Sequence, residues 1–386
     1  MAIITTALFG DLVFLPYRVE APMKETLSWK TSVFTSHDGT ESTEKKRTIP
    51  RTKLQYSLPI PADEMARSFN LFSNTIGQTW AVPLWSEEQY IGAVSSGATS
   101  VSATVANYAF RNASLALLWE SKTKWQLLEI TTVDGASINI SGTTDEFTNA
   151  LLMPCRVGYI DGMPKRNSNV HNGNITVDFQ VSDGKAVAEI APAQHLTNDI
   201  YTDEVLGGEN ITETLENKVN FVDGNIGAVS YSTPWTDSRN KKQVSWVLET
   251  PAEIYSFRQF MARRAGKYRV FWQPSFFNDL RNASTGTVLA TLKVYADDYL
   301  EHATDRIYIS VQDMSGAWHH RNISVALVDT ATVTSLVLDS ALNLESDDIK
   351  TISYTGLRRL EADNITLNWL GGGVVKSTVS ILEVSH

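Results

Sequence analysis

Apolar and polar residues alternate in short runs along most of the chain, as expected for β-strands that bury one face. Gly, Asp, Asn and Ser separate the runs at intervals that suit β-sandwiches or barrels. The pattern predicts strands at Leu54–Leu58, Val101–Val105, Leu115–Trp119, Trp125–Thr131, Ile175–Phe179, Val244–Glu249, Val288–Tyr295, Arg306–Val311, Ile323–Val328 and Ile365–Leu370. The chain is therefore predicted to be mainly β.

Two segments instead show helical spacing. Pro61 and Asp63 begin the first, which runs over Ala62–Thr75 with Met65, Phe69 and Phe72 on one side. In the second, Thr250 is the expected N-cap, Pro251 the first helical residue and Glu253 the third, which suits a capping box. Its apolar stripe is Ile254, Phe257, Phe260 and Met261. Gly77 and Gly266 stand where a C-terminal glycine would end each helix.

The two halves of the chain resemble each other. Leu54, Tyr56 and Leu58 lead into Pro61, and Val244, Trp246 and Leu248 lead into Pro251, an offset of 190 (244 − 54, 251 − 61). Asn174–Phe179 returns as Asn364–Trp369, again 190 later (364 − 174). Short strands can match by chance, but several elements in one order favour an internal duplication.

The duplication divides the chain into three parts. Residues 1–180 form the first repeat and residues 235–386 the second. Residues 181–234 are interpreted as a linker or extended arm, because periodic apolar positions fade between Gln180 and Pro234. Ser36–Arg51 reads as a long loop with Asp38-Gly39 as its turn, and loops of this length often contact partners.

Composition limits the function. The 386 residues carry a formal net charge of −10, which argues against a dedicated nucleic-acid binder. Cys155 is the only cysteine, so no disulfide framework or thiolate metal cluster is expected, and its strand-like surroundings predict a buried apolar role. Residues 1–15 lack the basic start of a signal peptide, and no apolar run is long enough for a membrane span.

Catalytic chemistry finds no support in the sequence. The histidines are scattered, and the paired carboxylates, such as Asp297-Asp298, look like turn or surface residues. There is no Gly-x-Ser-x-Gly, phosphate loop or His-Glu-x-x-His. We therefore predict no catalytic residue, no metal and no cofactor.

Basic clusters are the remaining candidates for a site. They comprise Lys45, Lys46 and Arg47, then Lys241 and Lys242, then Arg263 and Arg264. One interpretation is solvated loops, a sharper one is contact with acidic neighbouring subunits, and a third is contact with DNA passing through a lumen. Together with Asp38 and Gly39, these cations are the predicted interface residues.

One long segment, Phe257–Pro274, resembles the aromatic-rich signature of tail-tip (baseplate) proteins of long-tailed bacteriophages, and Ser36–Glu41 and Trp80–Trp85 resemble its counterpart in the first half. The resemblance implies two tail-tube-like strand–helix–strand units, each followed by an antiparallel β-barrel or sandwich region. Such units pack into a ring around the DNA channel, in hub proteins as trimers with two units per chain and in distal tail proteins as hexamers. The duplication fits the hub arrangement somewhat better.

The same resemblance implies the partners and the location. The chain would assemble with itself as a trimer or hexamer, with the tail-tube protein and with other tail-tip proteins, and DNA would only pass through. It would be a structural virion protein, assembled in the host cytoplasm. Some relatives bind an iron–sulfur cluster through several cysteines, and the single Cys155 departs from that pattern.

A receptor- or carbohydrate-binding tail adhesin is the alternative. Ten tryptophans are many for this length, and exposed ones could form a sugar platform, although packing in β cores is the more ordinary use.

Overall fold

The computed structural model describes residues 2–168, 172–204, 211–223, 225, 227, 229–235 and 238–384. Strands contain 53% of the residues and helices 10%, and the sheets are largely antiparallel. This confirms the prediction of a mainly β chain with a few helices. Within these residues, no helix has both the length and the apolar character needed to cross a membrane.

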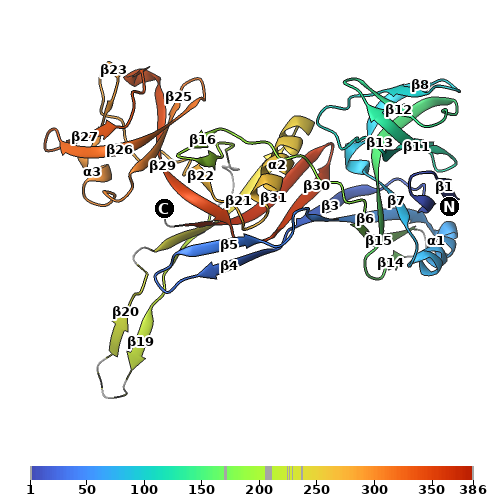
Figure 1. Cartoon of the computed structure of the whole chain (residues 1–386), viewed down its shortest axis with the longest axis horizontal. Helices are drawn as coiled ribbons and strands as arrows, with labels where there is room; N and C mark the ends of the chain where they lie inside the picture. Colours follow the sequence, from blue (N-terminus) through green and yellow to red (C-terminus); the bar gives the residue numbers. More distant parts are fainter. Residues whose placement is uncertain are drawn as a thin grey trace.

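One sheet crosses the middle of the molecule and joins its two halves (Figure 1). Its strands are antiparallel neighbours in the order β14 (Lys165–Ser168), β15 (Asn172–Val181), β6 (Arg51–Pro61), β3 (Glu20–Ser28), β30 (Asn364–Gly371), β31 (Val374–Glu383), β21 (Arg239–Leu248) and β18 (Glu213–Glu216). The β3–β30 ladder connects the halves, from Met23 opposite Trp369 to Ser28 opposite Asn364. We call these strands the central sheet.

Alternating side chains give the central sheet one apolar face. In β6, Leu54, Tyr56 and Leu58 are buried, and in β21 Val244 and Trp246 are. The helices α1 (Ala62–Thr75) and α2 (Pro251–Arg264) contribute to the same continuous core. Both helices therefore cover the same face of the central sheet.

The predicted helix ends are confirmed for α2. Thr250 Oγ1 accepts from the Glu253 amide at 3.2 Å, and the Glu253 carboxylate accepts from the Thr250 amide at 3.3 Å, which completes the capping box. Ala265 ends α2 in the left-handed region, followed by Gly266 with φ 72°. α1 differs, because Ile76 after its last residue stays right-handed and Gly77 has no positive φ.

Each helix leads into a short strand, β7 (Trp80–Pro83) or β22 (Phe271–Pro274). Each half later returns through a long strand, β13 (Phe147–Ile160) or β29 (Ile349–Leu360). β13 pairs with β7 and β15, and β29 pairs with β22 and β31.

A separate β region is inserted between the short and the long strand of each half. The first consists of η1 (Trp85–Glu87), β8 (Gln89–Val94), β9 (Ser100–Ser102), β10 (Ser114–Ser121), β11 (Lys124–Val133) and β12 (Ser137–Ile140). The second consists of β23 (Thr287–Val288), β24 (Thr291–Tyr295), α3 (Ala296–Tyr299), β25 (Tyr308–Asp313), β26 (Trp318–Val328), β27 (Val333–Leu338), β28 (Leu344–Glu345) and η2 (Ser346–Asp348). Each has its own core, and the two lie at opposite ends of the molecule (Figure 1). In chain order these regions follow β6–α1–β7 and β21–α2–β22, and the long strands β13 and β29 come after them.

The N-terminal segment supplies two hairpins. β1 (Ala2–Thr6) pairs with β2 (Gly10–Phe14). β4 (Thr31–Thr35) pairs with β5 (Glu41–Lys45) and extends beneath the second half (Figure 1). The predicted loop Ser36–Arg51 is thus wrong in part: its first residues form the turn and second strand of a hairpin, and Arg51 begins β6.

The segment 181–234, predicted as a loose arm, is partly packed. β16 (Gln194–His195) pairs with β17 (Asn198–Ile200), which runs parallel to β22, and Ile200 and Tyr201 are buried. Beyond it, β19 (Asn220–Asp223) and β20 (Val229–Ser232) form a hairpin that projects away from the body (Figure 1). The domain boundaries at 180 and 235 remain a prediction.

The matched segments Asn174–Phe179 and Asn364–Trp369 do not occupy equivalent places. The first lies in β15 beside β6, but the second lies in β30 beside β3, and β31 is the strand that pairs with β21. Strands with one buried face look alike in sequence, and ladder partners decide which of them correspond.

Candidate functional site

The face of the central sheet away from the helices is polar. In β6 the side chains of Lys53, Gln55 and Ser57 point to this face and are half-buried, between buried neighbours that point into the core. Three cross-strand hydrogen bonds of 2.8 Å lie on it: Gln55–Asp178, Ser57–Asn174 and Ser245–Thr378. We call this surface the polar face.

Cations outnumber carboxylates on the polar face, although the chain as a whole is acidic. Ladder partners and alternation place these cations there: Lys24, Arg51, Lys53, Lys241 and Lys376. Within the described strands of the central sheet, the carboxylates at facing positions are Glu20, Asp178 and Glu216. Lys53 lies 3.0 Å from Asp178, and the hydrogen bond to that carboxylate raises the pKa of Lys53.

Both ends of the central sheet are open. In the described part of the chain, β14 pairs with β15 alone and β18 with β21 alone. All residues of both strands are exposed. Met163 just before β14 is 77% exposed and Leu215 in β18 is 72% exposed, so each edge also presents an apolar side chain. Such edges readily pair with another strand.

A buried ion cluster holds the halves together on the core side. Arg258 in α2 donates to Glu87 of η1 at 2.5 Å and to Glu25 of β3, and its guanidinium lies 5.4 Å from the centre of the Trp369 ring. Burial lowers the pKa of Arg258, but the two carboxylates outweigh burial and raise it above its usual value. Arg258 therefore stays charged, and its contacts with Glu25 and Glu87 join the second half to the first.

The β4–β5 hairpin makes a second connection. Glu41 accepts from Arg239 Nη1 at 2.6 Å and from Arg359 Nε at 2.7 Å, and all three side chains are at least nine-tenths buried. Burial alone would raise the pKa of Glu41, but the bonds and charges of Arg359 and Arg239 lower it.

The first group of predicted interface residues lies on or beside this hairpin. The Asp38 carboxylate accepts from the Thr40 amide at 3.0 Å, and the Gly39 carbonyl accepts from Arg239. Lys45 approaches Glu189 at 3.9 Å, Lys46 pairs with Glu44, and Arg47 donates to the Ser28 carbonyl at 2.8 Å. Each of these residues has a partner in its own chain, and a role between subunits remains a prediction.

The second group is more deeply engaged. Lys241 pairs with Glu361 on the polar face, whereas Lys242 is 1% exposed and lies 3.7 Å from Glu213. Arg263 and Arg264 both bind the buried Asp199, and Arg264 is fully buried. Lys242 and Arg264 therefore do not offer their charge to a neighbouring subunit in this conformation.

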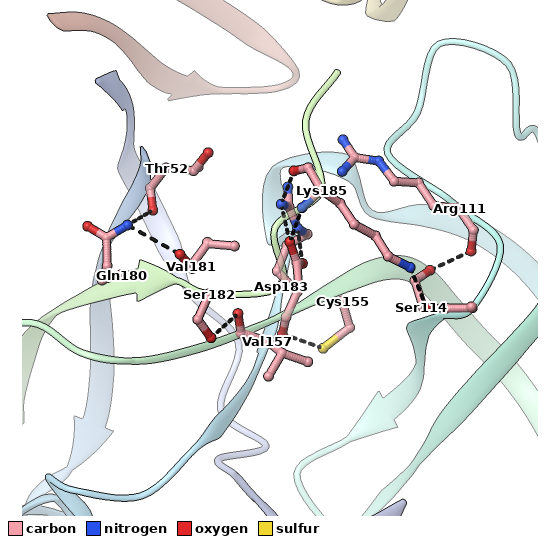
Figure 2. Close-up of polar contacts among 12 residues, drawn as sticks. Thr52, Arg111, Ser114, Cys155, Val157, Gln180, Val181, Ser182, Asp183 and Lys185 are labelled. Atoms are coloured by element: carbon pink, nitrogen blue, oxygen red, sulfur yellow. Dashed lines mark hydrogen bonds and ion pairs between the residues drawn. The ribbon is translucent and has the colours of Figure 1, made fainter. Parts of the chain in front are cut away.

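A third ion pair fastens the start of the segment after β15. Arg156 in β13 donates to Asp183 at 2.5 Å, and Lys185 Nζ donates to the Asn112 carbonyl at 2.8 Å. Figure 2 shows Asp183 and Lys185 near Cys155. Cys155 beside Arg156 is buried as predicted, and burial raises the pKa of its thiol well above the usual value. These contacts tie residues 183–185 to the first inserted region.

Sequence reasoning missed Arg258, Glu25, Glu87 and Glu41. One signal was present for Arg258, which is four residues after Ile254 and so shares the apolar side of α2. A charge on that side indicates a buried partner. The carboxylates gave no such signal, because their contacts join distant segments.

Within the described residues, His, Cys, Asp and Glu side chains form no group of three that could hold a metal ion. The chain matches no family model, and no curated protein matches it significantly.

Proposed function

We propose that this chain is a structural protein of the tail tip of a long-tailed bacteriophage. It forms a ring that joins the tail tube to the tip around the DNA channel, as a hub or distal tail protein, and is assembled in the host cytoplasm. Its partners are other copies of itself, the tail-tube protein and further tail-tip proteins. The proposal assigns it no catalytic activity.

The pairing of strands supports two equivalent units. Each unit has four neighbouring strands, one helix, one short strand and one long strand, and the strands pair in the same pattern. In the first unit these elements are β14, β15, β6, β3, α1, β7 and β13, and in the second they are β30, β31, β21, β18, α2, β22 and β29. Leu54 opposite Phe179 corresponds to Val244 opposite Val379, with offsets of 190 (244 − 54) and 200 (379 − 179). We infer a duplication whose second copy carries ten more residues before its returning strand.

The junction between these units indicates how copies would join. Inside the chain, β3 at the end of the first unit pairs with β30 at the start of the second. The equivalents of these strands are β18 and β14, and these are the two open edges. A β18–β14 ladder between neighbouring copies would continue the sheet, and a head-to-tail contact repeated around an axis closes into a ring.

The polar face is the observation that carries the proposal. A sheet that continues from copy to copy, with its helices on one side, presents the other side as one hydrophilic wall. Ser, Thr, Asn and Gln side chains dominate that wall and satisfy one another across strands. Such a wall is better suited to line a water-filled channel than to form a packed interface, because interface centres favour aromatic and apolar residues.

Electron microscopy tests the proposal directly. Purified virions labelled with an antibody against this chain should show the label at the tail tip, and averaged images of the tip should show a ring of three or six copies. Absence of the chain from purified virions would reject the structural role.

The adhesin alternative has one observation in its favour. A cavity of about 800 Å³ between the halves is lined by four aromatic residues, Tyr17, Trp85, Tyr108 and Trp369. Trp85 and Trp369 are 4% exposed, which leaves little ring surface for stacking on a sugar. Strong binding of the chain on a glycan array, lost on Tyr108→Ala, would favour this alternative.

A further inference from the structure

A groove on the polar face is lined by four cations. It has a volume of about 300 Å³ and lies between the end of β3 and the start of β6. Lys30, Arg47, Arg51 and Lys53 line it together with the hydroxyls of Thr26 and Ser28, and no carboxylate is among its described lining residues. In a chain of net charge −10, this is a local reversal of sign.

The four cations differ in how far they are already engaged. Arg47 is held by the carbonyls of Ser28 and Trp29, and Lys53 by Asp178 and Asp161. Lys30 and Arg51 are exposed, and no carboxylate of the described residues lies within ion-pair distance of either. Two cations are thus fixed in place and two remain available.

Hydrogen-bonded strands form the framework beneath the groove. Arg51 faces Ser28 and Lys53 faces Thr26 in the β3–β6 ladder. On the other side of β6, Gln180 donates to the Thr52 carbonyl at 3.0 Å, which fixes its amide at the groove (Figure 2). Arg51 and Lys53 are two residues apart on one strand, so their side chains leave the sheet about 7 Å apart. Arg51 and Lys53 therefore place two cationic side chains side by side along one strand.

We propose that this groove binds the phosphodiester backbone of double-stranded DNA without reading its sequence. Arg51 and Lys30 contact phosphate oxygens, and Arg47 adds to the positive field, whereas the charge of Lys53 is compensated by Asp161 and Asp178. This inference rests on the proposed function for the source of the polyanion. It adds that the wall holds DNA at defined points, one groove per copy.

The second half provides a matched control. Lys241 lies on β21 at the place that Arg51 has on β6, 190 residues later (241 − 51), but it is paired with Glu361. Its charge is therefore already compensated, and its loss should matter little for a bound phosphate.

The experiment is fluorescence anisotropy of a labelled DNA duplex of about 25 base pairs titrated with the whole chain at several salt concentrations. The unmodified chain should bind two unrelated sequences equally, and more weakly as salt rises. The double variant Arg51→Gln/Lys30→Gln should bind at least about tenfold more weakly, with a salt slope smaller by about 2, because each phosphate contact contributes about 0.9. Lys241→Gln should stay within about twofold of the unmodified chain.

Three outcomes would overturn the inference: no duplex binding at about 50 mM salt, equal binding by the double variant and the unmodified chain, or binding of inorganic phosphate without duplex. Because Arg51 and Lys30 are exposed, thermal unfolding should show both variants as stable as the unmodified chain. Microscopy distinguishes this inference from the proposed function. A chain that binds duplex DNA but forms no ring would support DNA binding by the groove and reject the ring.

Discussion

Arg258 and Glu87 are 171 residues apart in the sequence, yet their side chains meet at 2.5 Å and each is only 4% exposed. With Glu25 they form a buried cluster of one cation and two carboxylates, which joins α2 to the first half. Removing one partner from such a cluster leaves a buried charge without compensation.

Arg258→Ala should therefore lower the free energy of unfolding by about 3–5 kcal/mol, as measured by urea denaturation. Glu87→Gln should lower it less, since Glu25 remains beside the guanidinium. Arg281→Ala is the control, because Arg281 pairs with Asp297 and Asp298 at the surface, and its removal should change little. Equal effects of Arg258→Ala and Arg281→Ala would contradict the view that the cluster fixes the halves.

Glu41 predicts a pH dependence. Its pKa is lowered in the folded chain by Arg359 and Arg239, against the effect of burial, from a usual value of 4.5. A carboxyl with a lowered folded pKa stabilises the fold above its unfolded pKa and loses that contribution as pH falls through its folded pKa.

Glu41→Gln should thus be less stable than the unmodified chain at neutral pH, by about 3–5 kcal/mol. The gap should narrow as pH falls from about 4.5, the ordinary pKa of the unfolded carboxyl, through the lower pKa that Glu41 has in the folded chain. Thermal unfolding of both proteins across this range measures the gap. A gap that stayed constant would show that Glu41 does not act through its charge.

Lys242, unlike Glu41, should destabilise the fold at neutral pH. Burial lowers its pKa from 10.5 to about 8. At neutral pH the folded chain carries a buried charge that the unfolded chain solvates well, so this lysine destabilises the fold. Between about pH 8 and 10.5 the folded lysine is neutral while the unfolded one still binds a proton, so stability should rise with pH.

Lys242→Met should accordingly raise the free energy of unfolding at pH 7 by about 1–4 kcal/mol, and the gain should disappear towards pH 10.5. Lys241→Met, one residue away but facing outwards, is the control and should have little effect. A destabilised Lys242→Met would mean that the contact with Glu213 outweighs desolvation.

The open edges predict how assembly can be blocked. Leu215→Lys in β18 or Met163→Lys before β14 places a charge at an edge that the proposed ring requires, and charged edges discourage strand pairing. Both residues are already exposed, so the subunit should fold normally. Light scattering and microscopy of assembled tips should show lost or incomplete rings.

Val328→Lys is the matched control for assembly, because Val328 is 71% exposed on β26, in the second inserted region and away from both edges. Rings that formed equally well with Leu215→Lys and Val328→Lys would rule out the β18–β14 junction.

The pattern of the sequence was sufficient where structure is local. The α2 capping box depends on Thr250 and Glu253, three residues apart, and the alternation of Leu54, Tyr56 and Leu58 is a property of one strand. It failed where segments are covered on both faces. β13 is buried without interruption from Leu152 to Gly158, so it shows no alternation, and β29 hides Arg358 and Arg359 in its buried run.

By itself, then, the sequence determined the type of each element, because side-chain periodicity and capping act within a few residues. Only the tertiary structure decided that β30 lies beside β3, that Glu87 meets Arg258 and that Lys242 is buried while Lys241 is not. Those outcomes depend on which distant strands share a ladder and which face is covered. Alternation repeats in every strand, so it cannot distinguish one partner from another.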